Sequence, residues 1–300
     1  MTVPPAARVP LAGLALAAAG SVAFAGKAII VKLAYRHGVD AVTLIMLRML
    51  LALPLFLLLA WWAGRGKPAL TLRDWRAVAG LGFSGYYLAS FLDFAGLAYI
   101  SASLERLILY LNPTFVLGLS VLRLGQRVSH AQLVALLIGY AGVLLVFGHE
   151  VTLAGADVAL GAALVFASAV SYAVYLVYSG TEVKRLGALR LTGLASSVAC
   201  VLCIAQYLLL RAPQDALAVP AAVWWLSLLN ATACTFAPVI LVMLAIERVG
   251  ATVTAQTGMI GPLATIAMGV AILGEPFTPW LVAGTGLVLS GVWLLARAPR

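Results

Sequence analysis

Six charged side chains lie inside long apolar stretches of this sequence. At membrane depth a charge is costly, so it usually faces a cavity or an opposite charge and marks a pathway for a solute or a proton. The carboxylates Asp93 and Glu105 are candidates for accepting a coupling proton. The alternative is a fixed ion-pair network that ties helices together, to which we assign Lys27, Arg48 and Arg106. The six residues are Lys27, Lys32, Arg48, Asp93, Glu105 and Arg106.

The residues before Asp93 place it on a polar helical face. Gly82, Tyr86, Ser90 and Asp93 recur at intervals of four, four and three residues, so they share one side of a helix. A stripe of small, aromatic, hydroxyl and acidic residues suits the wall of a cavity better than a surface against lipid. Tyr87 is adjacent and is assigned to the same wall, with ordinary packing as the alternative for both tyrosines.

A second stripe begins at Glu105. Asn112 follows seven residues later on the same helical face, and Pro113 comes directly after it. A proline inside a helix leaves a backbone carbonyl without its donor, which is tolerated at membrane depth beside water, a solute or other protein. Further along the chain, Tyr172 and Tyr175 are expected to pack against neighbours or to lie near a membrane interface.

The second half of the chain offers neutral polar residues in place of charges. A cavity with hydrogen-bonding groups, aromatic rings and little net charge suits a zwitterion or an amphipathic metabolite. It does not suit a dianion, which would need paired basic side chains. The candidates for the wall in this half are Asn230, Pro238, Gln256, Thr257 and Pro262.

No other constellation of reactive side chains is present in the sequence. Cys200 and Cys203 have the spacing of a redox or metal pair, but no histidine lies near them, and we expect small packing residues there. We therefore predict no catalytic residue, no metal and no cofactor. The sequence also lacks a Gly-x-x-x-x-Gly-Lys-Ser/Thr stretch for ATP, which argues against direct drive by ATP.

The elements that must position these residues are membrane-spanning helices. Apolar residues make up 64% of the 300 residues, charged residues 10%, and the mean hydropathy is +1.08. That excess of apolar residues cannot be buried in one soluble core. A span needs about 20 residues. Runs of suitable length occur at roughly 11–35, 41–62, 75–99, 102–122, 131–148, 157–180, 189–210, 221–246, 251–273 and 279–297.

The positions of the basic residues predict how these helices cross the membrane. The net charge of +9 could suggest nucleic acid, but the basic residues lie in short loops between apolar runs, so we expect no nucleic-acid partner. With the N-terminus inside, thirteen of the nineteen Lys and Arg residues fall on the inner side and two on the outer side. Cytoplasmic loops are enriched in Lys and Arg, so both termini are predicted to be cytoplasmic.

The two halves of the sequence repeat each other at an offset of 149 residues. Five spans in each half is an odd number, so the second copy would enter the membrane from the opposite side, as in many secondary transporters. The predicted organisation is a first repeat at 1–148, an outer linker at 149–156 and a second repeat at 157–300. The matching pairs are Ser101-Ala102-Ser103 with Gly250-Ala251-Thr252, Pro113 with Pro262, Leu124-Gly125-Gln126 with Leu273-Gly274-Glu275, and Gly142-Val143 with Gly291-Val292.

The segments 102–113 and 124–129, with their partners at 250–262 and 273–276, resemble the fourth-span and ninth-span signatures of the drug/metabolite transporter superfamily, EamA type. The resemblance covers nearly the whole chain. It implies ten spans in two inverted five-helix repeats, cytoplasmic termini, and a central cavity lined by spans three, four, eight and nine. Gln126-Arg127 departs from the usual Gly-Glu-Arg, and Asn112 stands where an acidic or aromatic residue often precedes the proline.

Together these features predict an all-α, multi-pass protein of the cell inner membrane. The expected function is secondary transport, and specifically export, of small organic solutes such as amino acids, by alternating access. The alternative is an intramembrane enzyme acting on a lipid-linked substrate, which would need clustered acids or a nucleophile with a base. The expected partners are the solute and the bilayer; a monomer is compatible with this function, and the oligomeric state stays open.

Overall fold

The computed structural model describes residues 10–124, 129–155 and 157–297, and the regular structure in these ranges is helical throughout. Seven helices in the described ranges are long and apolar enough to cross a membrane, which confirms the all-helical, multi-pass prediction. The count of ten spans stays a prediction. The seven are α1 (Leu11–Tyr35), α2 (Ala41–Gly64), α7 (His130–Ala154), α8 (Asp157–Leu186), α9 (Ala188–Leu210), α14 (Pro279–Arg297) and a composite helix that begins with α11 (Ala221–Ala231).

The other predicted spans consist of shorter pieces, joined by π-helical segments or breaks. They correspond to the predicted third, fourth and ninth spans, and the composite helix contains a π-helical segment as well. Interrupted helices at membrane depth are tolerated where they line a cavity or pack on protein. The pieces are α3 (Leu72–Leu81), η1 (Gly82–Leu88) and α4 (Ala89–Leu97); α5 (Ala102–Leu109) and α6 (Asn112–Leu124); η2 (Thr232–Phe236) and α12 (Ala237–Gly258); and α13 (Ile260–Met268) and η3 (Gly269–Leu273).

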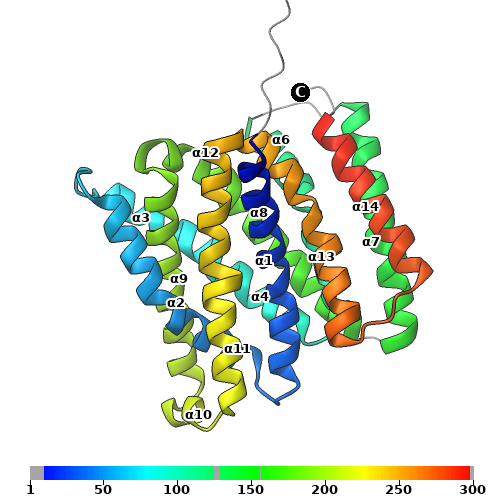
Figure 1. Cartoon of the computed structure of the whole chain (residues 1–300), viewed down its shortest axis with the longest axis horizontal. Coiled ribbons are helices and arrows are strands. Elements are labelled where there is room, and N and C mark those ends of the chain that lie inside the picture. Colours follow the sequence, from blue (N-terminus) through cyan, green and yellow to red (C-terminus); the bar gives the residue numbers. More distant parts are fainter. Residues whose placement is uncertain (1–9, 125–128, 156, 298–300) are drawn as a thin grey trace, which may run out of the picture.

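The helices run roughly along one direction, so the bundle has two ends (Figure 1). The start of α1 and the end of α14 lie at the same end, which we call the terminal end. The opposite end, which we call the distal end, carries the short helix α10 (Pro213–Leu217). Both helix pairs α1–α2 and α4–α5 are connected at the distal end, at residues 36–40 and 98–101.

Side-chain caps and glycines set the helix boundaries. Asp40 accepts a hydrogen bond from the Thr43 backbone N–H over 2.9 Å at the start of α2. Helix α7 continues through most of the predicted linker 149–156 and ends where Gly155 adopts a φ of +84°. A left-handed φ of this kind favours glycine, so the turn between α7 and α8 is shorter than the sequence suggested.

Contacts between the two halves follow their internal repeat. Helix α2 packs on α9, and α7 packs on α14, so each of these helices contacts the helix at the matching position of the other half. Helix α1 contacts α12, and its counterpart α8 contacts α4. The same interface is therefore used twice, as an approximate two-fold relationship between the halves requires.

Glycines make the contact between α7 and α14 close and symmetric. A Cβ added at Gly142 would lie 2.6 Å from the carbonyl oxygen of Gly284, and one at Gly291 would lie 2.7 Å from that of Ala135. Gly291 and Gly284 are the residues 149 positions after Gly142 and Ala135. Small residues let helix backbones approach in a membrane, and here the repeat supplies them to both sides of one interface.

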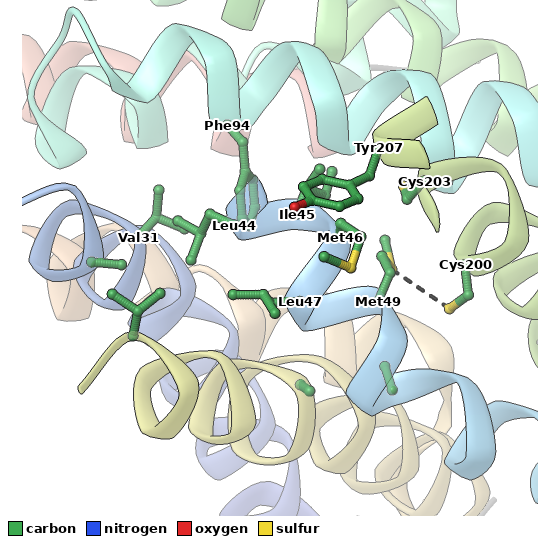
Figure 2. Close-up of a cluster of buried hydrophobic side chains, with 14 of the residues drawn as sticks. Val31, Leu44, Ile45, Met46, Leu47, Met49, Phe94, Cys200, Cys203 and Tyr207 are labelled. Carbon is green, nitrogen blue, oxygen red and sulfur yellow. Dashed lines mark hydrogen bonds between the residues drawn. The ribbon is translucent and has the colours of Figure 1, made fainter. Parts of the chain in front are cut away.

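The largest apolar cluster lies between α1, α2, α4 and α9 near the distal half of the bundle. Figure 2 shows Leu44 and Leu47 of α2 near Val31, with the ring of Phe94 above them. The Sγ of Cys200 lies 3.6 Å from the Sδ of Met49. Cys200, Cys203 and Cys234 are free and buried, in line with the expected packing role.

Candidate functional site

A cavity of about 560 Å³ lies inside the bundle, between helices of both halves. Its wall combines hydroxyl groups, aromatic rings and charged side chains with a larger apolar surface. The polar and charged residues in the wall are Ser21, Lys27, Arg48, Tyr86, Ser90, Asp93, Arg106, Tyr110, Asn112, Ser168, Tyr172, Tyr175, Ser179, Thr192, Ser196 and Thr235.

Two π-helical segments border this cavity at matching positions of the repeat. An offset of 149 residues maps η1 onto residues 231–237, which contain η2. The wider turn exposes backbone carbonyls, and hydroxyls of α8 bind the carbonyls of η1 and α4: Ser171 donates to Ser84 over 2.8 Å and Ser168 to Ala89 over 2.6 Å. Such π-segments often accompany functional sites, because they re-aim side chains within an otherwise regular helix.

The helix interruptions that precede Pro113 and Pro262 also match. Helix α5 ends at Leu109 and α6 begins at Asn112, while α12 ends at Gly258 and α13 begins at Ile260. The hydroxyl of Tyr110 donates to the backbone carbonyl of Gly258 over 2.8 Å, joining the two interruptions. The prolines thus shape the helices behind the cavity, and neither is among the residues of its wall.

An ion cluster forms the distal wall of the cavity. The Nζ of Lys27 lies 2.5 Å from Oδ2 of Asp93 and 3.4 Å from Oε1 of Glu105. Asp93 is 2% exposed and Glu105 is fully buried, so one ammonium group on α1 faces two carboxylates from α4 and α5. Glu105 is not in the cavity wall itself. It lies behind the wall, in contact with the wall residue Lys27.

Arg106 holds the other side of this cluster mainly through neutral partners. Its Nε donates to Oγ1 of Thr265 over 3.0 Å, and its Nη2 donates to the carbonyl of Phe24 over 3.2 Å. The distance from Nε to Oε2 of Glu105 is 3.9 Å. Neither carboxylate oxygen of Glu105 has a hydrogen-bond donor among the described residues. Glu105 is therefore the least satisfied charge of the cluster.

Arg48 lies in the cavity wall and apart from these ion pairs. Its guanidinium carbon sits 4.4 Å from the centre of the Phe94 ring. No carboxylate in the described part of the chain lies within ion-pair distance of it. The predicted network of Lys27, Arg48 and Arg106 therefore comes together for Lys27 and Arg106, and Arg48 stands outside it.

Apolar and polar contacts close the distal side of the cluster. Phe94, Leu97, Ile100 and Leu104 are each no more than 2% exposed. Beyond them, Glu275 of the second half accepts hydrogen bonds at the start of α5 from Ala102 N (2.7 Å), Ser103 N (3.2 Å) and Ser103 Oγ (2.6 Å). We call this contact the Glu275 clasp. A carboxylate is well placed at a helix N-terminus, where backbone N–H groups lack partners.

Other basic residues strengthen the same end. Lys32 donates to the carbonyls of Leu97 (3.1 Å) and Ile100 (3.0 Å), and so caps the end of α4 rather than entering the cavity. Arg36 donates to the carbonyl of Leu273 over 2.5 Å. The wall residues, in contrast, continue from the cluster toward the terminal end as far as Ser179 and Gly258. The cavity is thus sealed toward the distal end by the clasp, Arg36 and Lys32.

Several predicted residues lie in the cavity wall and several do not. Tyr86, Ser90, Asp93 and Asn112 line it, whereas Tyr87, Pro113, Pro238, Thr257 and Pro262 are not among its described wall residues. Asn230 is buried behind it and donates to the carbonyl of Lys27 over 3.5 Å, and Thr257 donates to the carbonyl of Val253 over 2.9 Å. The side chain of Gln256 lies outside the described part of the structure.

Helix α8 contributes a wall that the sequence analysis did not assign. Tyr172 and Tyr175 were expected to pack or to face an interface, but they line the cavity together with Ser168 and Ser179. The hydroxyl of Tyr175 lies 3.1 Å from that of Tyr86. The spacing of these four residues, at intervals of four, three and four, carries the same signal as the stripe that ends at Asp93.

Comparison with known proteins gives the class to which this arrangement belongs. The EamA-like transporter family model matches residues 11–148 and 159–297, so each half matches it once. The chain is 32% identical over 300 residues to the uncharacterized transporter YcbK of Bacillus subtilis, covering 95% of this chain and 94% of that protein. It is 26% identical over 229 residues to an uncharacterized transporter of Archaeoglobus fulgidus, covering 75% of this chain and 79% of that one.

A solved protein structure shares the fold, with a TM-score of 0.60, 16% identity, and coverage of 94% of this chain and 95% of the other. The polar cavity inside an apolar helical bundle is therefore that of a multi-pass membrane transporter, and the family and its relatives are described as transporters rather than enzymes. The chain belongs to the EamA-like transporter family.

Proposed function

We propose that this protein is a secondary transporter of the cell inner membrane that exports small organic solutes, such as amino acids, by alternating access. The observation that carries the proposal is the internal cavity of about 560 Å³ whose distal wall holds Lys27 and Asp93, with Glu105 behind them. Its volume falls within the range of about 300–1,000 Å³ that is usual for small-molecule sites. Aromatic and hydroxyl groups in the wall suit an amphipathic solute.

The proposed membrane topology has ten spans and both termini in the cytoplasm. The terminal end of the bundle carries most of the basic loop residues, which supports a cytoplasmic location for that end. The distal end then faces the other side of the membrane. The cavity is built within one chain, so a monomer would suffice, and the expected partners are the bilayer and the solute, with no nucleic acid.

Alternating access is supported by the unequal ends of the cavity. The Glu275 clasp and the buried Leu97 and Ile100 close the distal side, while the wall extends toward the terminal end. In this conformation a solute would load from the cytoplasm. Rocking of the interrupted helices of the two halves against each other would open the distal side, as in other transporters with inverted repeats.

Proton coupling is supported by the surroundings of the two carboxylates that contact Lys27. Asp93 and Glu105 share this one ammonium group, and the oxygens of Glu105 have no hydrogen-bond donor among the described residues. A buried carboxylate whose oxygens receive no hydrogen bond is costly as an anion, so Glu105 is suited to take up a proton. Lys27 and Arg106 are the basic groups that face the pair, and Tyr35, which donates to the carbonyl of Phe94 over 2.5 Å, lies on its distal side.

The test is flux in proteoliposomes that contain the purified protein and an imposed pH gradient. A panel of amino acids, nucleosides and drugs is screened for pH-driven uptake or efflux. We expect at least one small organic solute to be carried, and we expect Asp93→Asn to abolish the dependence on the pH gradient while the protein stays folded. Exchange of internal for external solute should persist in this variant, because it does not require net proton movement.

The matched control is Asp157→Asn, since Asp157 is an exposed carboxylate at the start of α8. It should leave pH-driven flux unchanged. Unaltered pH-driven flux in Asp93→Asn would exclude the coupling role of Asp93. Absence of flux for the whole panel in the unmodified protein would contradict transport of these solute classes.

A further inference from the structure

Arg48 is a buried cation in the cavity wall that lacks an oxygen partner among the described residues. It is 4% exposed, and its Nε has no hydrogen-bond partner. The contacts of its guanidinium group are the Sδ of Met49, 4.0 Å from Nη2, and the ring of Phe94 at 4.4 Å. Its neighbours in the sequence, Leu47 and Met49, are apolar and buried, and both are labelled in Figure 2. A guanidinium group carries five N–H donors and stays charged, so this environment leaves most of its donors unused.

The other buried or half-buried cations of the described bundle are bound to oxygen atoms. Lys27 pairs with Asp93, Lys32 with backbone carbonyls, and Arg106 with Thr265 and a backbone carbonyl. Arg190, which is 8% exposed, donates to the carbonyl of Pro68 over 3.0 Å. A purely structural arginine would be expected to have such partners, because burying an unpaired charge is strongly unfavourable.

The charges around the cavity leave one positive charge in excess. The charged groups in and behind the wall are the cations Lys27, Arg48 and Arg106 and the carboxylates Asp93 and Glu105. Of the three cations, Lys27 and Arg106 lie within ion-pair distance of a carboxylate. Arg48 is therefore the uncompensated charge. A bound group with one negative charge would compensate it, whereas a group with two would exceed it.

We propose that Arg48 binds the carboxylate of the transported solute, so that the substrates are small organic molecules with one carboxylate group. This inference rests on the proposed transport function and narrows its substrate class. Carboxylates match the planar fork of a guanidinium group and can accept two parallel hydrogen bonds from it. The aromatic and hydroxyl wall formed by Tyr86, Tyr175 and Ser90 then contacts the remainder of the solute.

The test measures binding separately from transport. The purified protein is mixed in detergent with L-phenylalanine, L-leucine, phenylacetate or L-phenylalaninamide, and the shift in Tm gives the apparent affinity. We expect the carboxylates to raise Tm and the amide, which has no carboxylate, to have little effect. In Arg48→Met the affinity for the carboxylates should fall about tenfold to a hundredfold, as expected for loss of hydrogen bonds to a charged group.

Two further variants distinguish a loss of binding from a general folding defect. Arg48→Lys retains the positive charge but not the planar guanidinium group, and should keep part of the affinity for the carboxylates. Arg190→Met removes a buried arginine that is not among the described cavity residues, and should lower Tm without changing the preference for carboxylate over amide. Arg48→Met itself should not lower the Tm of the free protein, because its neighbours are apolar.

The outcomes separate this inference from the proposed function. It is overturned if no carboxylate stabilises the unmodified protein, if the amide binds as well as the acid, or if Arg48→Met keeps full affinity. If the carboxylates bind through Arg48 and no flux is found in proteoliposomes, the carboxylate site stands and the transport proposal fails.

Discussion

The phenol of Tyr110 donates a hydrogen bond to the backbone carbonyl of Gly258, and the residue four positions after Gly258 is Pro262. In an uninterrupted helix that carbonyl would receive the N–H of residue 262, which a proline lacks. Tyr110 belongs to the first half of the chain and Gly258 to the second, so the donor missing from one repeat is replaced by a side chain of the other.

Tyr110→Phe should therefore destabilise the protein through Gly258. Loss of a donor to a buried carbonyl costs about 1–3 kcal/mol. In a Pro262→Ala background the backbone N–H returns, so the same Tyr110→Phe change should cost distinctly less. Thermal unfolding of the four proteins measures this as a double-mutant cycle. Equal effects of Tyr110→Phe in both backgrounds would contradict the exchange of donors.

Lys27→Met should be more harmful than loss of either carboxylate alone. It leaves Asp93 and Glu105 buried next to each other without their shared ammonium group, and breaking a buried pair in this way costs about 3–5 kcal/mol. Adding Asp93→Asn to Lys27→Met should restore part of the lost stability. Tm and the yield of monodisperse protein are the measurements. A double variant no more stable than Lys27→Met would show that Lys27 acts through other contacts.

Glu275→Ala should destabilise the conformation in which the distal side of the cavity is closed. Hydrogen bonds to a charged group contribute about 1.5–3 kcal/mol, and Glu275 makes three with Ala102 and Ser103. With the native cysteines replaced by alanine, a Ser90→Cys probe in the cavity wall should react several-fold faster with an impermeant maleimide added outside cells.

The control for this experiment is Glu182→Ala, which removes a glutamate paired with Arg185 at the terminal end of α8. It should leave labelling from outside unchanged. A Glu275→Ala protein labelled no faster than its parent would mean that the clasp does not hold the distal end closed.

Gly142→Val should disrupt the contact between α7 and α14. Its new Cβ would lie 2.6 Å from the carbonyl oxygen of Gly284, which is backbone and cannot rotate away. Overpacking of this kind typically costs about 1–3 kcal/mol, so Tm should fall. Gly291→Val should behave in the same way, because its Cβ would lie 2.7 Å from the carbonyl oxygen of Ala135. Gly286→Val on the same helix α14 meets nothing within 4 Å and should leave Tm nearly unchanged.

Much of the architecture could be read from periodicity and composition. The apolar runs, the offset of 149 residues and the shared face of Tyr86, Ser90 and Asp93 each correspond to an observed feature. An ion-pair network was one of the two interpretations of the charges inside the membrane, because such charges need partners, and Lys27 does lie beside Asp93 and Glu105. These predictions depend on rules that act locally along one helix or on the strong cost of a buried charge.

What the sequence could not reveal depends on how helices face each other. The spacing of Ser168, Tyr172, Tyr175 and Ser179 marks one polar face of α8, but it does not reveal that this face turns toward η1 and the cavity. Arg48 was assigned to the ion network because it had the right charge and depth, yet α2 places it beside Phe94 instead. The π-helical segments were missed because one extra residue in a turn leaves no mark in composition.

The carboxylate of the Glu275 clasp has no counterpart in the sequence at the matching position of the first half. The residue 149 positions earlier is Gln126, an uncharged amide, and the residues corresponding to Ser101 and Ser103 are Gly250 and Thr252. Two conformations that exchange these ends therefore differ in energy even when no solute is bound. Without bound solute, the protein should therefore populate mainly the conformation in which the distal side is closed. This energy difference determines which conformation the empty carrier populates and the rate at which it returns to that conformation after releasing solute. The direction of net transport depends only on the gradients.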